Sequence, residues 1–321
     1  MEATEVAAEQ VERKRRSRLM EFIRRLVREQ PLGTVGGIIV LLLLFCGIFA
    51  DLLAPYGMNE IHLLDRYAPP SWKYPLGADQ LGRDILSRII HGARISVIIG
   101  LSATSINLVV ALLIGATTGF FGGKFDMVVQ RFVDAWMAFP GLLILITVMS
   151  LVGQGQLQII LVLGIVGGIS GSRIARSAVI GIKENVYFLA ARAVGTPTPQ
   201  ILFRHVLPNI MAPMIVIFTV TIGDVIIAEA SLSFLGLGLP PDVASWGGML
   251  SWEGRRYMER VPALALWPGF CLFIVVWGTN MFGDALRDLL DPRLKGGQGS
   301  YGTAVVKRKK GLLSRLLNPF A

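Results

Sequence analysis

Polar residues that interrupt long apolar stretches are the first candidates for chemistry. Residues 168–171, G-I-S-G, place a serine between glycines, which is the pattern of an intramembrane serine protease. Such an enzyme needs a histidine on a neighbouring span as its general base. The histidines, His62, His91 and His205, all lie outside the long apolar stretches. We therefore favour a packing role for these glycines, because small residues let helices approach closely.

A second possible chemistry is proton coupling by acidic residues within the membrane. Asp224 and Glu229 fall in one apolar stretch, and ionisable residues in a span are functional candidates by default. They do not share one helix face well at this spacing. A proton relay needs a chain of such groups, and the other stretches offer little beyond Asn107. We keep Asn107, Asp224 and Glu229 as candidates for lining a translocation path.

The sequence contains no G-x-x-x-x-G-K-[ST] phosphate loop and no H-E-x-x-H zinc motif. Cys46 and Cys271 each fall in an expected span, which favours packing over a disulfide or a metal site. The chain also lacks a basic patch interleaved with aromatic residues, so nucleic acid is not an expected partner. We predict no catalytic residue, no metal and no cofactor on this chain. If ATP drives the protein, another chain must bind it.

A membrane fold must position these residues. The chain is 53% hydrophobic and 17% charged, whereas soluble domains carry about a quarter charged residues. Its apolar residues gather in runs long enough to cross a bilayer as helices. We predict an all-α membrane protein with about six transmembrane helices, and we expect Pro140 to kink the third or to begin its buried part. The predicted spans are residues 34–54, 95–121, 127–152, 157–182, 210–235 and 263–282.

The other segments follow from these spans. Residues 1–33 are basic, with apolar residues at helical spacing, and form either an amphipathic segment on the membrane lipid or an ordinary basic flank. Residues 55–94 are predicted to form an extracytoplasmic loop, 95–295 a core of five spans, and 296–321 a basic cytoplasmic tail. Most of the 31 lysines and arginines lie on one side of this topology. The positive-inside rule therefore predicts that both termini and residues 183–209 are cytoplasmic.

Residues 183–209, between the fourth and fifth spans, are polar but look structured. Residues 185–194 can form a short helix rich in alanine, and Gly195 can end it at positive φ. We expect Thr198 to cap a second helix with Pro199 at its first position, and Pro208 to end that helix. Two short helices of this kind make a compact docking site for a partner in the water phase. We call residues 183–209 the knob.

Residues 190–195, A-A-R-A-V-G, followed by L-P-N at 207–209, resemble the E-A-A-x(3)-G loop of ABC importer permeases. Other stretches resemble the second permease of the dipeptide/oligopeptide/nickel importers, from residue 75 to residue 294 and in order. They are P-L-G-A-D-Q-L-G-R-D-I-L-S-R, G-F-F-G-G-K-F-D, S-L-S-F-L-G-L-G-L-P-P with S-W-G, and G-D-A-L-R-D-L-L-D-P-R-L. Leu189 stands where the first glutamate of the loop motif is usual.

The resemblance implies a transport subunit of a bacterial or archaeal plasma membrane that performs no chemistry itself. It implies a homologous permease chain, two ABC ATPase subunits that bind ATP and magnesium, and an extracytoplasmic substrate-binding protein as partners. Peptides are the favoured cargo, although related permeases carry nickel, glutathione or sugars. The knob would be the coupling loop, seated in a groove of the ATPase.

Carried over residue by residue, the resemblance gives two sets of candidate contacts. Those for the ATPase are Phe188, Ala190, Ala191, Arg192, Ala193, Gly195, His205 and Pro208. Those for the binding protein are Asp242, Trp246 and Trp252. The alternative functions are a self-sufficient secondary transporter and an intramembrane hydrolase, either of which should tolerate a scrambled 188–195 segment.

Overall fold

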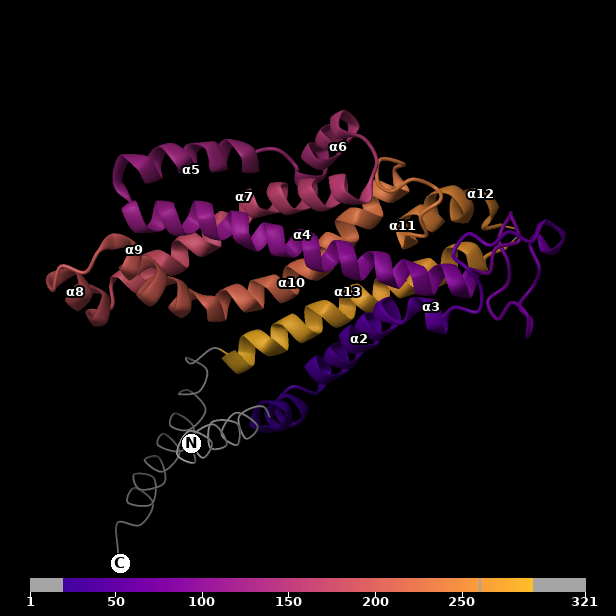
Figure 1. The fold of residues 1–321 in the computed structure, drawn as a ribbon, viewed down its shortest axis with the longest axis horizontal. Helices are drawn as coiled ribbons and strands as arrows, with labels where there is room; N and C mark the ends of the chain where they lie inside the picture. The colour runs from indigo at the N-terminus through magenta and orange to yellow at the C-terminus, as the bar shows by residue number, and fades with distance from the viewer. Residues whose placement is uncertain (1–19, 260, 291–321) are drawn as a thin grey trace, which may run out of the picture.

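The computed structural model describes residues 20–259 and 261–290, and within these ranges the fold is a bundle of helices (Figure 1). Residues 20–29 are helical and lead into the first long helix. The long helices are α2 (Pro31–Ile48), α4 (Ile85–Phe121), α7 (Gln156–Lys183), α10 (Leu207–Phe234) and α13 (Ala263–Leu290). Shorter helices are α3 (Ala50–Leu53), α5 (Gly123–Met137), α6 (Gly141–Val152), α8 (Val186–Ala193), α9 (Thr198–Ile201), α11 (Trp246–Gly248) and α12 (Arg255–Tyr257). The prediction of an all-α membrane fold is confirmed.

The described residues contain 5 helices long and apolar enough to cross a membrane, or up to 6 if α5 and α6 are counted as one bent span. The axes of α5 and α6 differ by 88°. Pro140 directly precedes α6 and is its N-cap residue, at the bend between the two helices, so the first of the two alternatives expected for it, a kink, is confirmed. Figure 1 shows α5 running beside α4 and α7, and α6 turned away from that direction near the first residues of α7.

The start of the second span differs from the prediction. Helix α4 begins at Ile85, ten residues earlier than expected, and the preceding loop is correspondingly shorter. Asp84 caps the helix, because its Oδ2 accepts a hydrogen bond from the backbone N–H of Ser87 at 2.8 Å. The polar residues of this first part look like loop residues in the sequence. The structure instead pairs one of them, Arg94, with Asp51 at 2.8 Å.

The second half of the knob also differs from the prediction. Residues Thr198–Phe234 form one continuous span through a π-helical segment, Leu202–Val206. Pro208 does not end a helix but lies in the first turn of α10. The N–H of Leu207 already bonds to Leu202 O, five residues back, so the hydrogen-bond register has shifted before the proline. Thr198 is the first residue of α9 and does not cap it.

Glycines bring the central helices together. A Cβ placed on Gly164 or Gly168 of α7 would lie 2.6 Å from side-chain atoms of Ile106 or Val110 on α4. Likewise, a Cβ on Gly33 or Gly36 of α2 would overlap atoms of α13. Such contacts are possible only for residues without side chains, which confirms the packing role predicted for the glycines of the fourth span.

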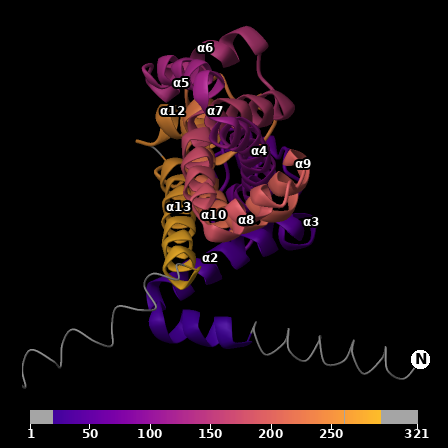
Figure 2. The same ribbon diagram turned by 90° about the vertical axis from the view of Figure 1, so that its left-hand side faces the viewer.

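Two ends of the bundle can be distinguished in Figure 1. Helices α8 and α9, the α4–α5 turn and the C-terminal end of α13 lie at what we call the knob end. Helices α3, α11 and α12 and the loop of residues 54–84 lie at the loop end. Figure 2 views the molecule from the knob end, with α2 and α13 on one side and α5 and α6 on the other. The predicted basic tail and the first part of the N-terminal segment lie outside the described residues.

Candidate functional site

The knob is fixed to the bundle by the inner face of α8. Phe188 is 2% exposed and packs in a cluster that includes Val179 and Ile182 of α7 and Met214 of α10. Its ring also meets that of Phe120 of α4 edge to face, with centroids 6.1 Å apart. Phe188 of the knob therefore packs against α4 and α7, which precede the knob in the sequence, and against α10, which follows it.

Gly195 ends α8 through a complete Schellman motif. Its φ is +78°, and its N–H bonds to Arg192 O at 3.0 Å while that of Thr196 bonds to Ala191 O at 3.1 Å. These bonds use carbonyls that the end of a helix otherwise leaves unpaired. The stop predicted at Gly195 is confirmed, and it makes the knob a defined structure.

The outer face of α8 is apolar and exposed. Val186 is 81% exposed, Leu189 55% and Val194 85%. Val186 and Leu189 are three positions apart and share one face of α8 with Ala190 and Ala193, both exposed. Because it carries so little charge, this face is suited to contact with another protein.

Lys183 connects the base of the knob to α4. Its ammonium donates to Gly119 O at 3.1 Å and to Phe120 O at 2.9 Å. These are carbonyls of the last turn of α4, where a cation also interacts favourably with the helix dipole. This contact could not be predicted from the sequence. Its only sign is a lysine at the end of the fourth span.

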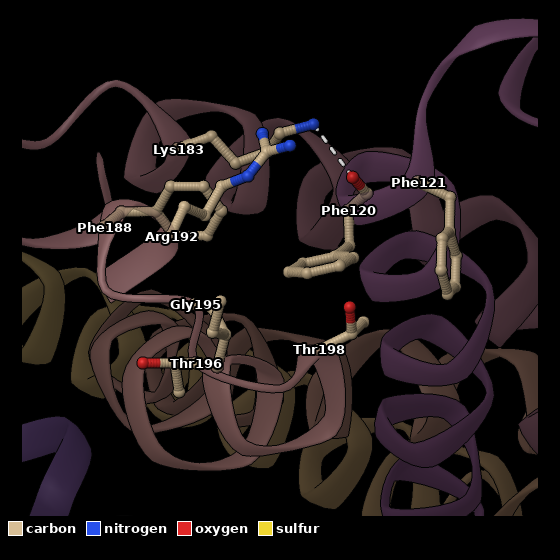
Figure 3. Close-up of a pocket in the computed structure, with 9 residues that line it drawn as sticks. Phe120, Phe121, Lys183, Phe188, Arg192, Gly195, Thr196 and Thr198 are labelled. Carbon is tan, nitrogen blue, oxygen red and sulfur yellow. Dashed lines mark hydrogen bonds between the residues drawn. The ribbon is translucent and has the colours of Figure 1, made fainter. Parts of the chain in front are cut away.

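Between the knob and the end of α4 lies a pocket of about 370 Å³. Figure 3 shows Lys183 and Arg192 at its upper side, Phe120 and Phe121 across from the knob, and Thr196 and Thr198 below. Gly195 and Ile201 complete the lining on the knob side.

The structure places the predicted coupling residues in different environments. Ala190, Arg192, Ala193, Gly195 and Pro208 are exposed. Ala191 and His205 are half-buried, and Phe188 is buried. Phe188 therefore anchors the knob and does not form part of its outer surface.

The predicted path residues do not form one cluster. Asn107 is 8% exposed and lies against Gly167 and Gly171 of α7. Glu229 is 1% exposed and accepts a hydrogen bond from Ser233 Oγ at 2.7 Å. Asp224 is exposed on the side of α10. Of the three, only Asp224 points out of this chain.

At the loop end, the predicted docking residues also separate. Trp246 is 2% exposed and its indole N–H bonds to Ile89 O at 3.1 Å, so it holds the loop to α4 and does not reach the surface. Asp242 is exposed, and its carbonyl accepts from Asn59 Nδ2 at 2.7 Å. The side chain of Trp252 lies outside what the structure describes.

Comparison with known protein families agrees with this architecture. Residues 111–296, more than half of the chain, match the family described as "Binding-protein-dependent transport system inner membrane component". Residues 17–70 match the "N-terminal TM domain of oligopeptide transport permease C". The chain belongs to the ABC importer permeases.

Individual relatives cover most of this permease. The di/tripeptide transport system permease protein DppC of Pseudomonas aeruginosa is 38% identical over 82% of this chain and 89% of its own. The oligopeptide transport system permease protein OppC of Bacillus subtilis is 38% identical over 84% and 88%. The glutathione transport system permease protein GsiD of Pectobacterium atrosepticum is 38% identical over 86% and 91%. The resemblance drawn from the sequence is confirmed, and the chain is a multi-pass membrane protein.

Proposed function

We propose that this permease forms half of the translocation path of a peptide importer, with a homologous permease chain as the other half. Two ABC ATPase subunits hydrolyse ATP, one of them docked on the knob of this chain, and a substrate-binding protein docks at the loop end. The permease catalyses no reaction and binds no cofactor. The names of the relatives favour a di-, tri- or oligopeptide cargo, with glutathione, itself a peptide, in the same class.

The observation that carries this proposal is the two-faced knob. Its inner face is packed through Phe188 against α4, α7 and α10. Its outer face presents Val186, Leu189 and Val194 with nothing in the described chain to cover them. Because the knob is rigid and packed on both the partner and the spans, movement of a docked partner would move the spans as well.

Docking can be tested with Val194→Asp, which introduces a carboxylate into the outer face. The expected result is loss of the ATPase subunits from the purified complex and loss of peptide uptake by membrane vesicles. Leu64→Asp is the matched control for ATPase retention, because Leu64 is fully exposed in the loop of residues 54–84, at the end opposite the knob. Retention of both ATPase and uptake in Val194→Asp would contradict the proposed docking surface. Uptake by this chain alone, without ATP, would instead favour a secondary transporter.

We also propose that the knob end, with both termini, is cytoplasmic. A membrane-impermeant maleimide should label Leu64→Cys in intact cells, and Val194→Cys only after the membrane is opened and the ATPase subunits are stripped from it. The native Cys46 and Cys271 are half-buried within helices of the bundle, and the unsubstituted protein provides their background. Labelling of Val194→Cys from outside would reverse the orientation.

A further inference from the structure

We propose that the pocket between the knob and the end of α4 binds the phosphate of an anionic phospholipid. The pocket combines positive charge, hydroxyl groups and aromatic rings where a helix end meets the polar knob. Nothing in the function proposed above requires a ligand here, so this inference stands apart from it.

The charged side chains that line the pocket are all positive. Arg192 and Lys183 both line it, and no carboxylate does. Within the described part of the chain Arg192 has no ion-pair partner. Asp126 lies near enough to Lys183 to interact electrostatically. Its carboxylate, however, is bound on both oxygens by Arg176, at 2.6 Å each.

The donors of the pocket suit a phosphate group. Lys183 uses two of its N–H groups on carbonyls of α4 and keeps a third. The Arg192 guanidinium offers a planar set of donors that matches phosphate oxygens. Figure 3 shows both cationic side chains on the same, upper side of the pocket. Two neighbouring like charges repel each other, and an anion between them would relieve that repulsion.

The surroundings favour a lipid as the source of the phosphate. Phe121 is 63% exposed and Phe125 is 50% exposed, and their rings meet edge to face at 6.2 Å. These aromatic side chains continue from the pocket onto the outer surface of α4 and α5, both parts of candidate spans. Acyl chains could lie along this surface while the headgroup enters the pocket. Basic pockets at the ends of transmembrane helices are a recurrent type of anionic lipid site.

The test uses the complete permease complex in neutral detergent, depleted of lipid and titrated with phosphatidylglycerol or phosphatidylcholine. Bound lipid is counted by native mass spectrometry, and protection is measured as a shift in the unfolding temperature. We expect phosphatidylglycerol to be retained and to stabilise the complex. Phosphatidylcholine should be neither retained nor stabilising. Arg192→Gln should weaken phosphatidylglycerol binding about five- to tenfold.

Arg204→Gln is the matched control, because Arg204 is an exposed cation of the same knob that does not line the pocket. It should bind phosphatidylglycerol as the unsubstituted protein does. Lys183 is unsuitable as the primary test, since its removal would also free carbonyls of α4. The unfolding temperature of Arg192→Gln without lipid checks that this variant folds.

The other outcomes overturn the proposal. Equal binding of both lipids, or equal losses in the two arginine variants, would mean that the pocket does not select an anionic headgroup. If inorganic phosphate gives the same protection and phosphatidylglycerol adds nothing, the site takes a free anion and not a lipid. If Arg192→Gln keeps its lipid but loses the ATPase subunits, the partner of Arg192 is a protein carboxylate.

Discussion

Phe188 and Gly195 give the knob its structure by different means. Phe188 contributes a large buried ring, and Gly195 contributes a backbone conformation that other residues adopt only with strain. The sequence indicated the role of Gly195, since a glycine after the last turn of a short helix is a local signal, but it placed Phe188 among the ATPase contacts and not in the interior. It did not indicate that Phe188 meets Phe120, because residues so far apart in the sequence come together only through tertiary packing.

The buried ring provides the first prediction. Phe188→Ala should loosen the knob and abolish coupled uptake while the spans remain inserted, because such truncations cost about 3–5 kcal/mol in packed sites. Limited proteolysis within residues 183–209, followed beside peptide uptake, measures the effect. Phe203→Ala is the control, since Phe203 is in the same knob but 68% exposed. Similar proteolysis of the two variants would show that Phe188 is not the anchor.

A second prediction at the residue scale concerns acid sensitivity of the loop end. Asp65 Oδ2 accepts hydrogen bonds from Lys73 Nζ at 2.7 Å and from Tyr74 Oη at 2.8 Å. The bond from Lys73, then that from Tyr74, lowers the pKa of Asp65 below its usual value of about 3.9. A carboxyl whose pKa is lower in the folded state stabilises the fold above its unfolded pKa, and this stabilisation is lost as pH falls through the folded pKa.

The loop of residues 54–84 should therefore open in acid, below about pH 4. Hydrogen exchange of this loop in membranes, corrected for the pH dependence of the intrinsic amide rate, should show more opening in acid than at neutral pH. In Asp65→Asn the loop should be equally open at both pH values. Asp242→Asn, a change of the same kind at the same end, should leave the transition in place. A transition unchanged in Asp65→Asn would assign the acid sensitivity to another group.

At the scale of elements, most helices could be predicted from apolar runs, but two boundaries could not. Residues 85–94 carry three basic or imidazole side chains among apolar ones, so the sequence placed them in the loop. The structure buries Ile85 and Ile89 in a cluster with Trp246 and Met249, and this tertiary packing makes the helix favourable. Asp84 three residues before Ser87 was the one local sign of the true start. Pro208 looked like a helix end, and the π-helical segment that accommodates it has no signature in the sequence.

The glycines allow a prediction about two helices. A Cβ on Gly36 of α2 would lie 2.5 Å from the carbonyl oxygen of Gly278 on α13, whereas a Cβ on Gly181 of α7 would meet nothing within 4 Å. Gly36→Ala should therefore separate α2 from α13 and destabilise the permease. Gly181→Ala should stabilise it by about 0.5–1 kcal/mol, because alanine is the better helix former. Unfolding temperatures of the two variants in detergent should move in opposite directions, and a stabilised Gly36→Ala would contradict the close packing.

At the scale of the whole molecule, the described chain looks like part of a larger assembly. Its spans keep many apolar side chains on the outside, as a bilayer requires, but α10 also exposes a carboxylate at Asp224. A charged side chain facing lipid at the centre of a span costs about 2.5–3.5 kcal/mol on insertion scales. The sequence showed that the acid lies in a span. Only the structure shows that it faces outward while Glu229 is buried.

We propose that α10 faces water or the partner permease, which would accommodate the exposed carboxylate, so that Asp224 lines the path between the two chains. Asp224→Cys in the assembled importer should then react with a small, charged thiol reagent, and excess peptide cargo should slow this reaction. Leu113→Cys on α4 is the control, because Leu113 is 63% exposed on a span and is surrounded by apolar residues that suit lipid. It should remain unreactive.

If both cysteines resist the reagent, Asp224 is covered by protein and the path runs along another face. If both cysteines react, either the reagent has entered the bilayer or the complex has come apart. The unfolding temperature of the complex distinguishes the two, because it falls only if the complex has come apart.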